Sequence, residues 1–132
     1  MKILIAPNSM KHAAHAAEIA EAIKRGLAQA LPDSRLVLMP IADGGEHTLE
    51  ILAGSSRDTV ISCHTRDPLD RPMEASYAIL SDQETAVVEL SKASGIALLS
   101  EKERNPLFTT TYGTRLLVRD GLDRGCRHFI LP

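Results

Sequence analysis

Two short loops carry most of the residues whose types could do chemistry. Ser9 and Lys11 follow an apolar run at the N-terminus. A hydroxyl and a cation at the start of a helix suit an anion such as phosphate or carboxylate. Asn8 or Ser9 could equally be a helix cap, with Lys11 simply solvated. The loop lacks the GxxxxGK[ST] pattern of a Walker P-loop, so both interpretations stay open.

The second loop, Asp43-Gly44-Gly45-Glu46, combines two glycines with two carboxylates. The glycines permit a tight backbone and a close approach to a ligand. A carboxylate there could hold Mg²⁺ or accept the proton of an attacking hydroxyl. A sharp strand-to-helix turn needs the same residues, with Glu46 as a helix cap. The pattern is compatible with a ligand site and with a purely structural turn.

A third candidate is the hydroxyl-rich stretch 109–114, which opens the last predicted helix with Thr110 and Thr111. Such helix starts cap themselves, and they also bind anions well. His12, His15 and His47 lie in or near the first two loops, and together with Asp43 they could form the metal site of a hydrolase. No HExxH or similar spacing accompanies them, which favours structural roles.

The elements that must position these residues fall into two groups. Residues 2–6 and 35–39 read as short strands, and the apolar stripe over 16–31 predicts a helix between them. Strand, helix and strand within about forty residues form a βαβ unit with parallel strands. The loops 7–11 and 40–47 then lie at one edge of the sheet, where α/β proteins bind ligands.

The order of predicted elements changes after residue 57, from strand–helix–strand to consecutive strands. Residues 59–64, 73–80 and 85–90 read as strands joined by turns, so this part of the sheet is antiparallel. Residues 91–99 read as a loop or helical turn, and 110–122 as a helix that Gly125 closes. A strand over 128–131 follows. The change predicts a domain boundary near residue 60.

Composition excludes several classes of function. The chain has 132 residues and a formal net charge of −2, with no basic region suited to nucleic acid. No apolar run approaches the ~20 residues of a membrane span, and we expect a cytoplasmic protein. The cysteines, Cys63 and Cys126, show no CxxC spacing and are expected to be reduced thiols.

In this order, the motifs resemble the glycerate kinase family of the bacterial type that makes 2-phosphoglycerate. The resemblance covers essentially the whole chain. It rests on five segments: 5–11 (IAPNSMK), 40–46 (PIADGGE), 67–72 (DPLDRP), 93–96 (ASGI), and 105–107 (NPL) with 110–114 (TTYGT).

The resemblance implies an ATP-dependent kinase of D-glycerate, with Mg²⁺. The implied fold is α/β: a flavodoxin/Rossmann-like parallel βαβ start, then a mixed, partly antiparallel α/β segment of a second, inserted domain. We assign residues 1–58 to the first domain and 59–132 to the second. Lys11 would contact phosphate or the substrate carboxylate, and Asp43 the reacting hydroxyl or Mg²⁺. The substrate and phosphate positions would be Ser9, Gly44, Gly45, Glu46, Thr110 and Thr111.

Several positions depart from the family pattern. Asn8 stands where Asp is frequent, Met10 where Phe is usual, and His12 and Ala13 where small residues are usual. His47 replaces a third glycine, and it would obstruct the turn if that position needs a positive φ or lies against a ligand.

Family members are also much longer, and they continue after Leu131 into a Gly-rich loop. We therefore expect this chain to be an N-terminal portion, inactive by itself, whose open strand edges favour a homodimer. The alternative is a degenerate, non-catalytic domain that binds a small anion, which His12 and His47 favour.

Overall fold

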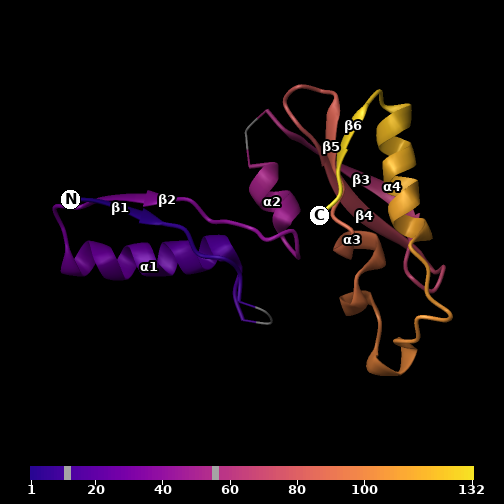
Figure 1. Cartoon of the computed structure of the whole chain (residues 1–132), viewed down its shortest axis with the longest axis horizontal. Helices are drawn as coiled ribbons and strands as arrows, with labels where there is room; N and C mark the ends of the chain where they lie inside the picture. Colours follow the sequence, from indigo (N-terminus) through magenta and orange to yellow (C-terminus); the bar gives the residue numbers. More distant parts are fainter. Residues whose placement is uncertain (11–12, 55–56) are drawn as a thin grey trace. The chain divides into compact units, whose positions relative to one another are not determined.

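The structure, a computed structural model, describes residues 1–10, 13–54 and 57–132. It divides the chain into two compact units, Met1–Ile51 and Leu52–Pro132 (Figure 1). The assignment of residues 1–58 and 59–132 to two domains stays a prediction.

The first unit contains the predicted βαβ arrangement. Strand β1 (Lys2–Ile5) pairs in parallel with β2 (Arg35–Leu38), and helix α1 (Ala16–Ala30) connects them. The N–H of His15 bonds to the Glu18 carboxylate over 3.0 Å at the start of α1. This contact satisfies a backbone group that the first turn leaves unpaired.

The second unit is built on a mixed sheet in the order β3-β4-β5-β6. Its strands are β3 (Thr59–Arg66), β4 (Pro72–Ile79), β5 (Thr85–Val87) and β6 (His128–Ile130). The first three are antiparallel neighbours, as predicted, and β6 pairs in parallel with β5. The α/β fold class with a parallel start and a mixed second part is confirmed.

One predicted strand is too long. The strand expected over 85–90 ends at Val87, because the chain turns into helix α3 (Ser91–Ser94). The N–H of Val88 still bonds to the Ile130 carbonyl over 2.9 Å. The 3₁₀ helix η1 (Ile96–Leu98) lies within 91–99, where a loop or helical turn was predicted, and a second one, η2 (Glu101–Glu103), lies where no element was predicted.

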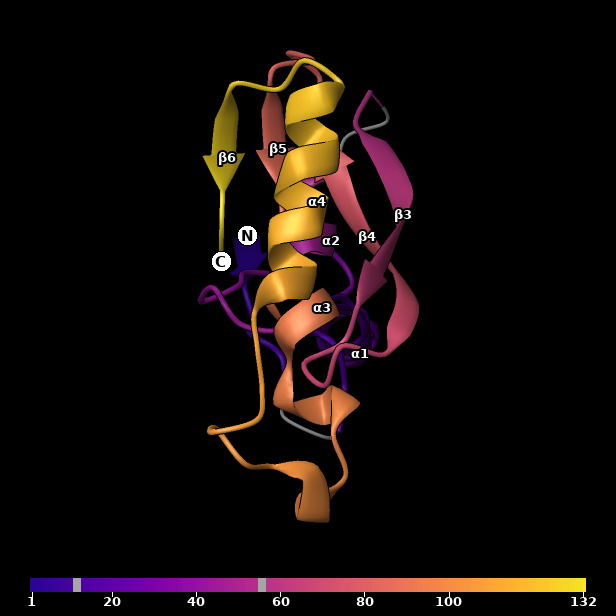
Figure 2. The ribbon, with the colours of Figure 1, turned by 90° about the vertical axis from the view of Figure 1, so that its right-hand side faces the viewer.

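Helix α4 (Tyr112–Asp123) covers one face of this sheet (Figure 2). The fully buried Tyr77 of β4 donates its hydroxyl proton to Asp120 of α4 over 2.7 Å. Gly125, at φ 101°, ends the helix. Its N–H bonds to the Leu122 carbonyl and that of Cys126 to the Gly121 carbonyl, a Schellman motif.

The start of α4 lies very close to β3. A Cβ added at Gly113 would lie 1.8 Å from the Arg66 carbonyl oxygen, so the site admits only glycine. The buried hydroxyl of Thr65 donates to the Gly113 carbonyl over 2.7 Å. These contacts fix the first turn of α4 against β3. They therefore also fix where the threonines 109–111, which directly precede the helix, lie.

Candidate functional site

In the first unit, the loops that follow β1 and β2 lie side by side. The parallel ladder continues past the strands, because the N–H of Met39 bonds to the Ile5 carbonyl and that of Ile41 to the Pro7 carbonyl, over 2.8 and 3.0 Å. The expectation that both loops share one edge of the sheet is confirmed. This is the carboxyl end of the parallel strands, where α/β folds bind ligands.

The glycine turn is organised by its own first carboxylate. Asp43 accepts the Gly45 N–H over 3.1 Å, and Gly44 adopts φ 93°, which glycine allows without strain. The Thr48 hydroxyl donates to the Gly45 carbonyl over 2.7 Å as helix α2 (Thr48–Leu52) begins. Asp43 and Glu46 therefore flank a tight, hydrogen-bonded turn, and both residues are exposed.

His47 adopts φ 69°, the left-handed region that favours glycine. A positive φ is one of the two conditions under which a histidine is unfavourable at this position. The His47 ring lies edge-on to that of His15, with centroids 3.8 Å apart, and its Nδ1 is 3.9 Å from the Glu50 carboxylate. The His47 side chain thus contacts His15 at a position where the family pattern has glycine and therefore no side chain.

The first loop is only partly described. Lys11 and His12 lie outside the described residues, so the structure places neither the proposed cation nor this histidine. The Ser9 N–H bonds to the Asn8 side chain over 2.8 Å, which favours a local turn. Across the described ranges, no group of three or more His, Cys, Asp or Glu is arranged to hold a metal ion.

The second unit contains a pocket of about 530 Å³, lying wholly within it. It brings together four segments that are distant in sequence: the turn 67–72, the α3–η1 region, the loop after η2, and the threonines before α4. The lining residues are Pro68, Ser94, Ile96, Leu99, Arg104, Asn105, Pro106, Thr109, Thr110 and Thr111. The motif segments quoted from this half of the sequence thus converge on one cavity.

Hydrogen bonds hold the pocket's polar wall. The Thr110 N–H bonds to the Pro68 carbonyl over 2.9 Å, and the Thr110 hydroxyl oxygen accepts the Tyr112 N–H over 3.1 Å. The Asn105 side-chain oxygen accepts the Leu107 N–H over 3.0 Å. The Asn105 amide NH₂ and the Thr110 hydroxyl proton each retain donor capacity for a ligand.

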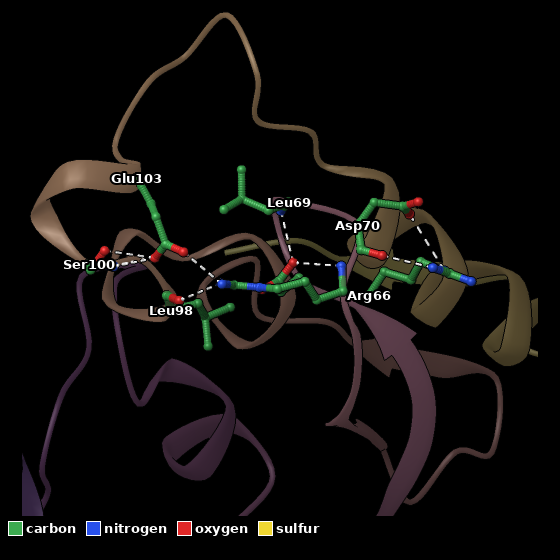
Figure 3. Close-up of polar contacts among 8 residues, drawn as sticks. Arg66, Leu69, Asp70, Leu98, Ser100 and Glu103 are labelled. Carbon is green, nitrogen blue, oxygen red and sulfur yellow. Dashed lines mark hydrogen bonds and ion pairs between the residues drawn. The ribbon is translucent and has the colours of Figure 1, made fainter.

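A charged network connects segments next to those that line the pocket, and Figure 3 draws its polar contacts. The Arg71 guanidinium bonds to Asp67 through Nε over 2.5 Å and to Glu103 through Nη1 over 2.7 Å. Asp67 also accepts the N–H groups of Leu69 and Arg71 over 2.8 and 2.9 Å. The network ties the turn after β3 to η2, and both segments lead into pocket-lining residues.

The network lowers the pKa of both of its carboxyl groups, Asp67 and Glu103. Burial by itself would raise the pKa of Asp67, but bonds from the Arg71 backbone and guanidinium and the Leu69 N–H hold that pKa below its usual value. The Ser100 N–H and hydroxyl, aided by Arg71, lower the pKa of Glu103. Both carboxylates are therefore stabilised in their charged form.

The predicted site residues thus fall into two sets. Thr110 and Thr111 line the pocket of the second unit, while Ser9, Asp43, Gly44, Gly45 and Glu46 belong to the paired loops of the first. Sequence reasoning missed Arg104, because one arginine next to a quoted motif carries no pattern of its own. Its position directly before Asn105-Pro106 was the available signal.

Comparison with known proteins gives consistent results. A sequence model of the Glycerate kinase family matches residues 3–132. A glycerate kinase of Bacillus cereus is 41% identical over 131 residues, which cover 99% of this chain and 34% of the relative. The glycerate 2-kinase of Escherichia coli is 37% identical, with coverage of 99% and 34%.

A solved structure agrees with these relatives. The crystal structure of a protein named glycerate kinase 2 from Salmonella typhimurium LT2 matches with a TM-score of 0.80 at 37% identity, covering 99% of this chain and 35% of that one. This chain therefore spans about a third of the length of the curated relatives that it matches. In its described part, no helix has the length and apolar character needed to cross a membrane.

Proposed function

This chain belongs to the glycerate kinase family, and from that premise we propose that it forms part of an ATP-dependent kinase that converts D-glycerate to 2-phosphoglycerate. The observation that carries the proposal is the similarity to named glycerate kinases along 99% of the chain. The convergence of the quoted motifs on one pair of loops and one pocket supports it.

The chemistry assigns distinct roles to the two loops. In the transfer, the substrate hydroxyl oxygen bonds to the terminal phosphorus of ATP, the bond from that phosphorus to the ADP oxygen breaks, and the hydroxyl proton must be accepted. We assign Asp43 to accept that proton and Lys11 to neutralise phosphate or carboxylate charge. Ser9, Gly44, Gly45 and Glu46 would hold the reacting groups through hydroxyl, backbone and carboxylate contacts, with Thr110 and Thr111 at the second unit's pocket.

The donor set also fits Mg²⁺. Proteins bind this ion through one or two carboxylates together with substrate phosphates, and Asp43 and Glu46 supply two carboxylates on one turn. Bound there, the ion would neutralise charge on the transferred phosphate. Asp43 is thus assigned either to the hydroxyl or to the ion, and the two roles predict different metal dependence.

A second function is favoured by one specific observation. His47 occupies a left-handed backbone position where the family pattern has glycine, and its ring packs on His15. A degenerate relative that binds a small anion without catalysis would tolerate such a change. The two proposals differ in whether this chain can complete a working kinase.

A chimera tests them directly. The aligned 131 residues of the Bacillus cereus glycerate kinase are replaced by this chain, and ADP release is followed in a coupled assay with D-glycerate. We expect D-glycerate-dependent turnover from the chimera and none from the 132-residue chain alone. A folded but inactive chimera beside an active parent would support the binding domain instead. Turnover by the chain alone would overturn its expected inactivity.

The expected homodimer also remains a proposal. In the described part of the chain, β1 and β2 form a sheet of two strands, so each has an open edge. Open edges pair readily with other strands. Sedimentation equilibrium of the chain over a range of concentrations would reveal a dimer, and a monomer at all concentrations would remove the idea.

A further inference from the structure

We infer that the pocket of the second unit recognises the carboxylate of a small hydroxy acid through Arg104. The inference rests on the proposed function and deepens it, because it assigns one end of the substrate to a named side chain. Arg104 was not among the residues predicted from the sequence.

The charge of the pocket is the first argument. Its ten described lining residues include one arginine and no carboxylate. Within the described residues, the Arg104 guanidinium has no hydrogen-bond or ion-pair partner, whereas the Arg71 guanidinium close by in the network is committed to Asp67 and Glu103. Arg104 is therefore the cation that remains available to a ligand in this cavity.

The neutral polar groups supply the second argument. Asn105 and Thr110 retain donor capacity beside Arg104, and Thr111 makes no capping bond to the start of α4. A hydroxy acid presents a planar carboxylate next to one or more hydroxyls. The guanidinium fork matches the carboxylate in a bidentate way, while amides and hydroxyls match the alcohol groups.

The number of charges separates a carboxylate from a phosphate. A polyphosphate carries several negative charges and is usually held by several cations or a metal ion. This pocket offers one cation for one negative charge. A singly charged acid is therefore the better match than inorganic phosphate or ATP.

The test is a titration of the ¹⁵N-labelled 132-residue chain with D-glycerate, followed by the backbone amide signals of 104–105 and 107–111, since Pro106 has none. Glycerol, which has the same carbon skeleton without the carboxylate, and inorganic phosphate serve as comparison probes. The variants are Arg104→Gln and, as a matched control, Arg119→Gln on the exposed side of α4. Arg104→Lys keeps the charge without the planar fork.

We expect D-glycerate to shift these amides at lower concentrations than glycerol or phosphate do. Arg104→Gln should weaken D-glycerate binding by about tenfold, because charge-assisted hydrogen bonds are roughly twice as strong as neutral ones. Arg104→Lys should have an intermediate affinity, and Arg119→Gln should bind as the unaltered chain does. The spectra of both glutamine variants also report whether the fold is intact.

Three results would overturn the inference: no D-glycerate shift at these amides, equal binding by Arg104→Gln, or stronger binding of phosphate than of D-glycerate. None of them bears on the kinase proposal, which fails only if the chimera lacks D-glycerate-dependent turnover. An active chimera with an unchanged KM for D-glycerate after Arg104→Gln would likewise refute the pocket assignment while leaving the proposed function in place.

Discussion

Arg71 and Glu103 form an ion pair of 2.7 Å that joins two segments 32 residues apart in the sequence. Arg71 belongs to the end of the turn after β3, and Glu103 ends η2. Arg71 also bonds to Asp67 of the same turn. One side chain therefore connects this turn to η2. The residues that this network supports, Pro68 and Arg104, face the cavity.

The first prediction concerns this link. Arg71→Gln should leave the sheet intact but speed amide hydrogen exchange of Leu99 and Arg104 several-fold, because η2 loses its tie to the turn. Amide exchange followed by NMR measures the effect. Arg119→Gln, in an exposed pair on α4, serves as the control and should leave these rates unchanged. Unaltered rates in Arg71→Gln would show that packing alone holds η2.

The second prediction concerns the buried carboxylate at the centre of the turn. Asp67 is only 6% exposed and accepts two backbone N–H groups as well as the Arg71 guanidinium. Asp67→Ala should lower the free energy of unfolding of the second unit by about 1–2 kcal/mol, since it leaves part-buried donors without their acceptor. Urea denaturation measures it. Glu74→Gln, on an exposed pair of β3 and β4, should change stability little.

The third prediction follows from the direction of the pKa shifts. The pKa values of Asp67 and Asp120 both lie below the ordinary 3.8, against the effect of burial, because Arg71 and Arg124 and further donors stabilise the charged forms. A lowered folded-state pKa gives stability that is present above the unfolded pKa and is lost as pH falls through the folded one.

The urea midpoint of the second unit should therefore stay level down to about pH 5 and fall progressively below that. Asp67→Asn, which cannot titrate, should show a shallower fall over the same range. Equal slopes for the variant and the unaltered chain would mean that Asp67 does not contribute to acid sensitivity.

The fourth prediction contrasts two glycines. Gly113→Ala should destabilise the second unit by about 3 kcal/mol or more, because the new methyl group overlaps the Arg66 carbonyl and must push α4 away from β3. Gly26 lies within α1, and no described atom beyond its chain neighbours and the backbone of its own helix comes within 4 Å of an added Cβ. Gly26→Ala should stabilise the first unit by about 0.5–1 kcal/mol. Thermal unfolding of both variants gives the comparison.

The fifth prediction concerns the glycine turn. His47→Gly removes the backbone strain of a histidine at positive φ, which should stabilise the turn by up to about 1 kcal/mol. The lost contact with His15 offsets part of this gain. Amide exchange of Thr48 and Leu49 should therefore become slower. His64→Gly, in the extended strand β3, should be destabilising instead. Faster exchange in His47→Gly would indicate that ring packing outweighs backbone strain.

The Asp43 assignment has its own test in the chimera. Asp43→Asn keeps an oxygen that can accept the Gly45 N–H, so the turn should persist while the negative charge is lost. We expect kcat to fall by about 10²–10⁴-fold if Asp43 accepts the proton. A loss that higher Mg²⁺ concentration reverses would assign Asp43 to the ion instead. Unchanged kcat would exclude both roles.

The sequence by itself determined the elements and the motifs. Apolar periodicity located α1, β1 and β2, turn residues located the β3–β4–β5 meander, and Gly125 marked the end of α4. These features depend on neighbours a few residues apart, so local patterns contain them. The family resemblance likewise depended on short segments in order.

The tertiary structure alone decided which segments meet beyond neighbouring strands. The parallel pairing of β5 with β6 and the Arg71–Glu103 link join residues far apart in sequence, and no local pattern encodes such contacts. The same holds for Arg104, which became a candidate only when folding placed it in a cavity with Asn105 and the threonines. His47 needed both sources. Comparison with the family pattern showed a histidine where glycine is usual, and the backbone geometry showed that this position has a positive φ.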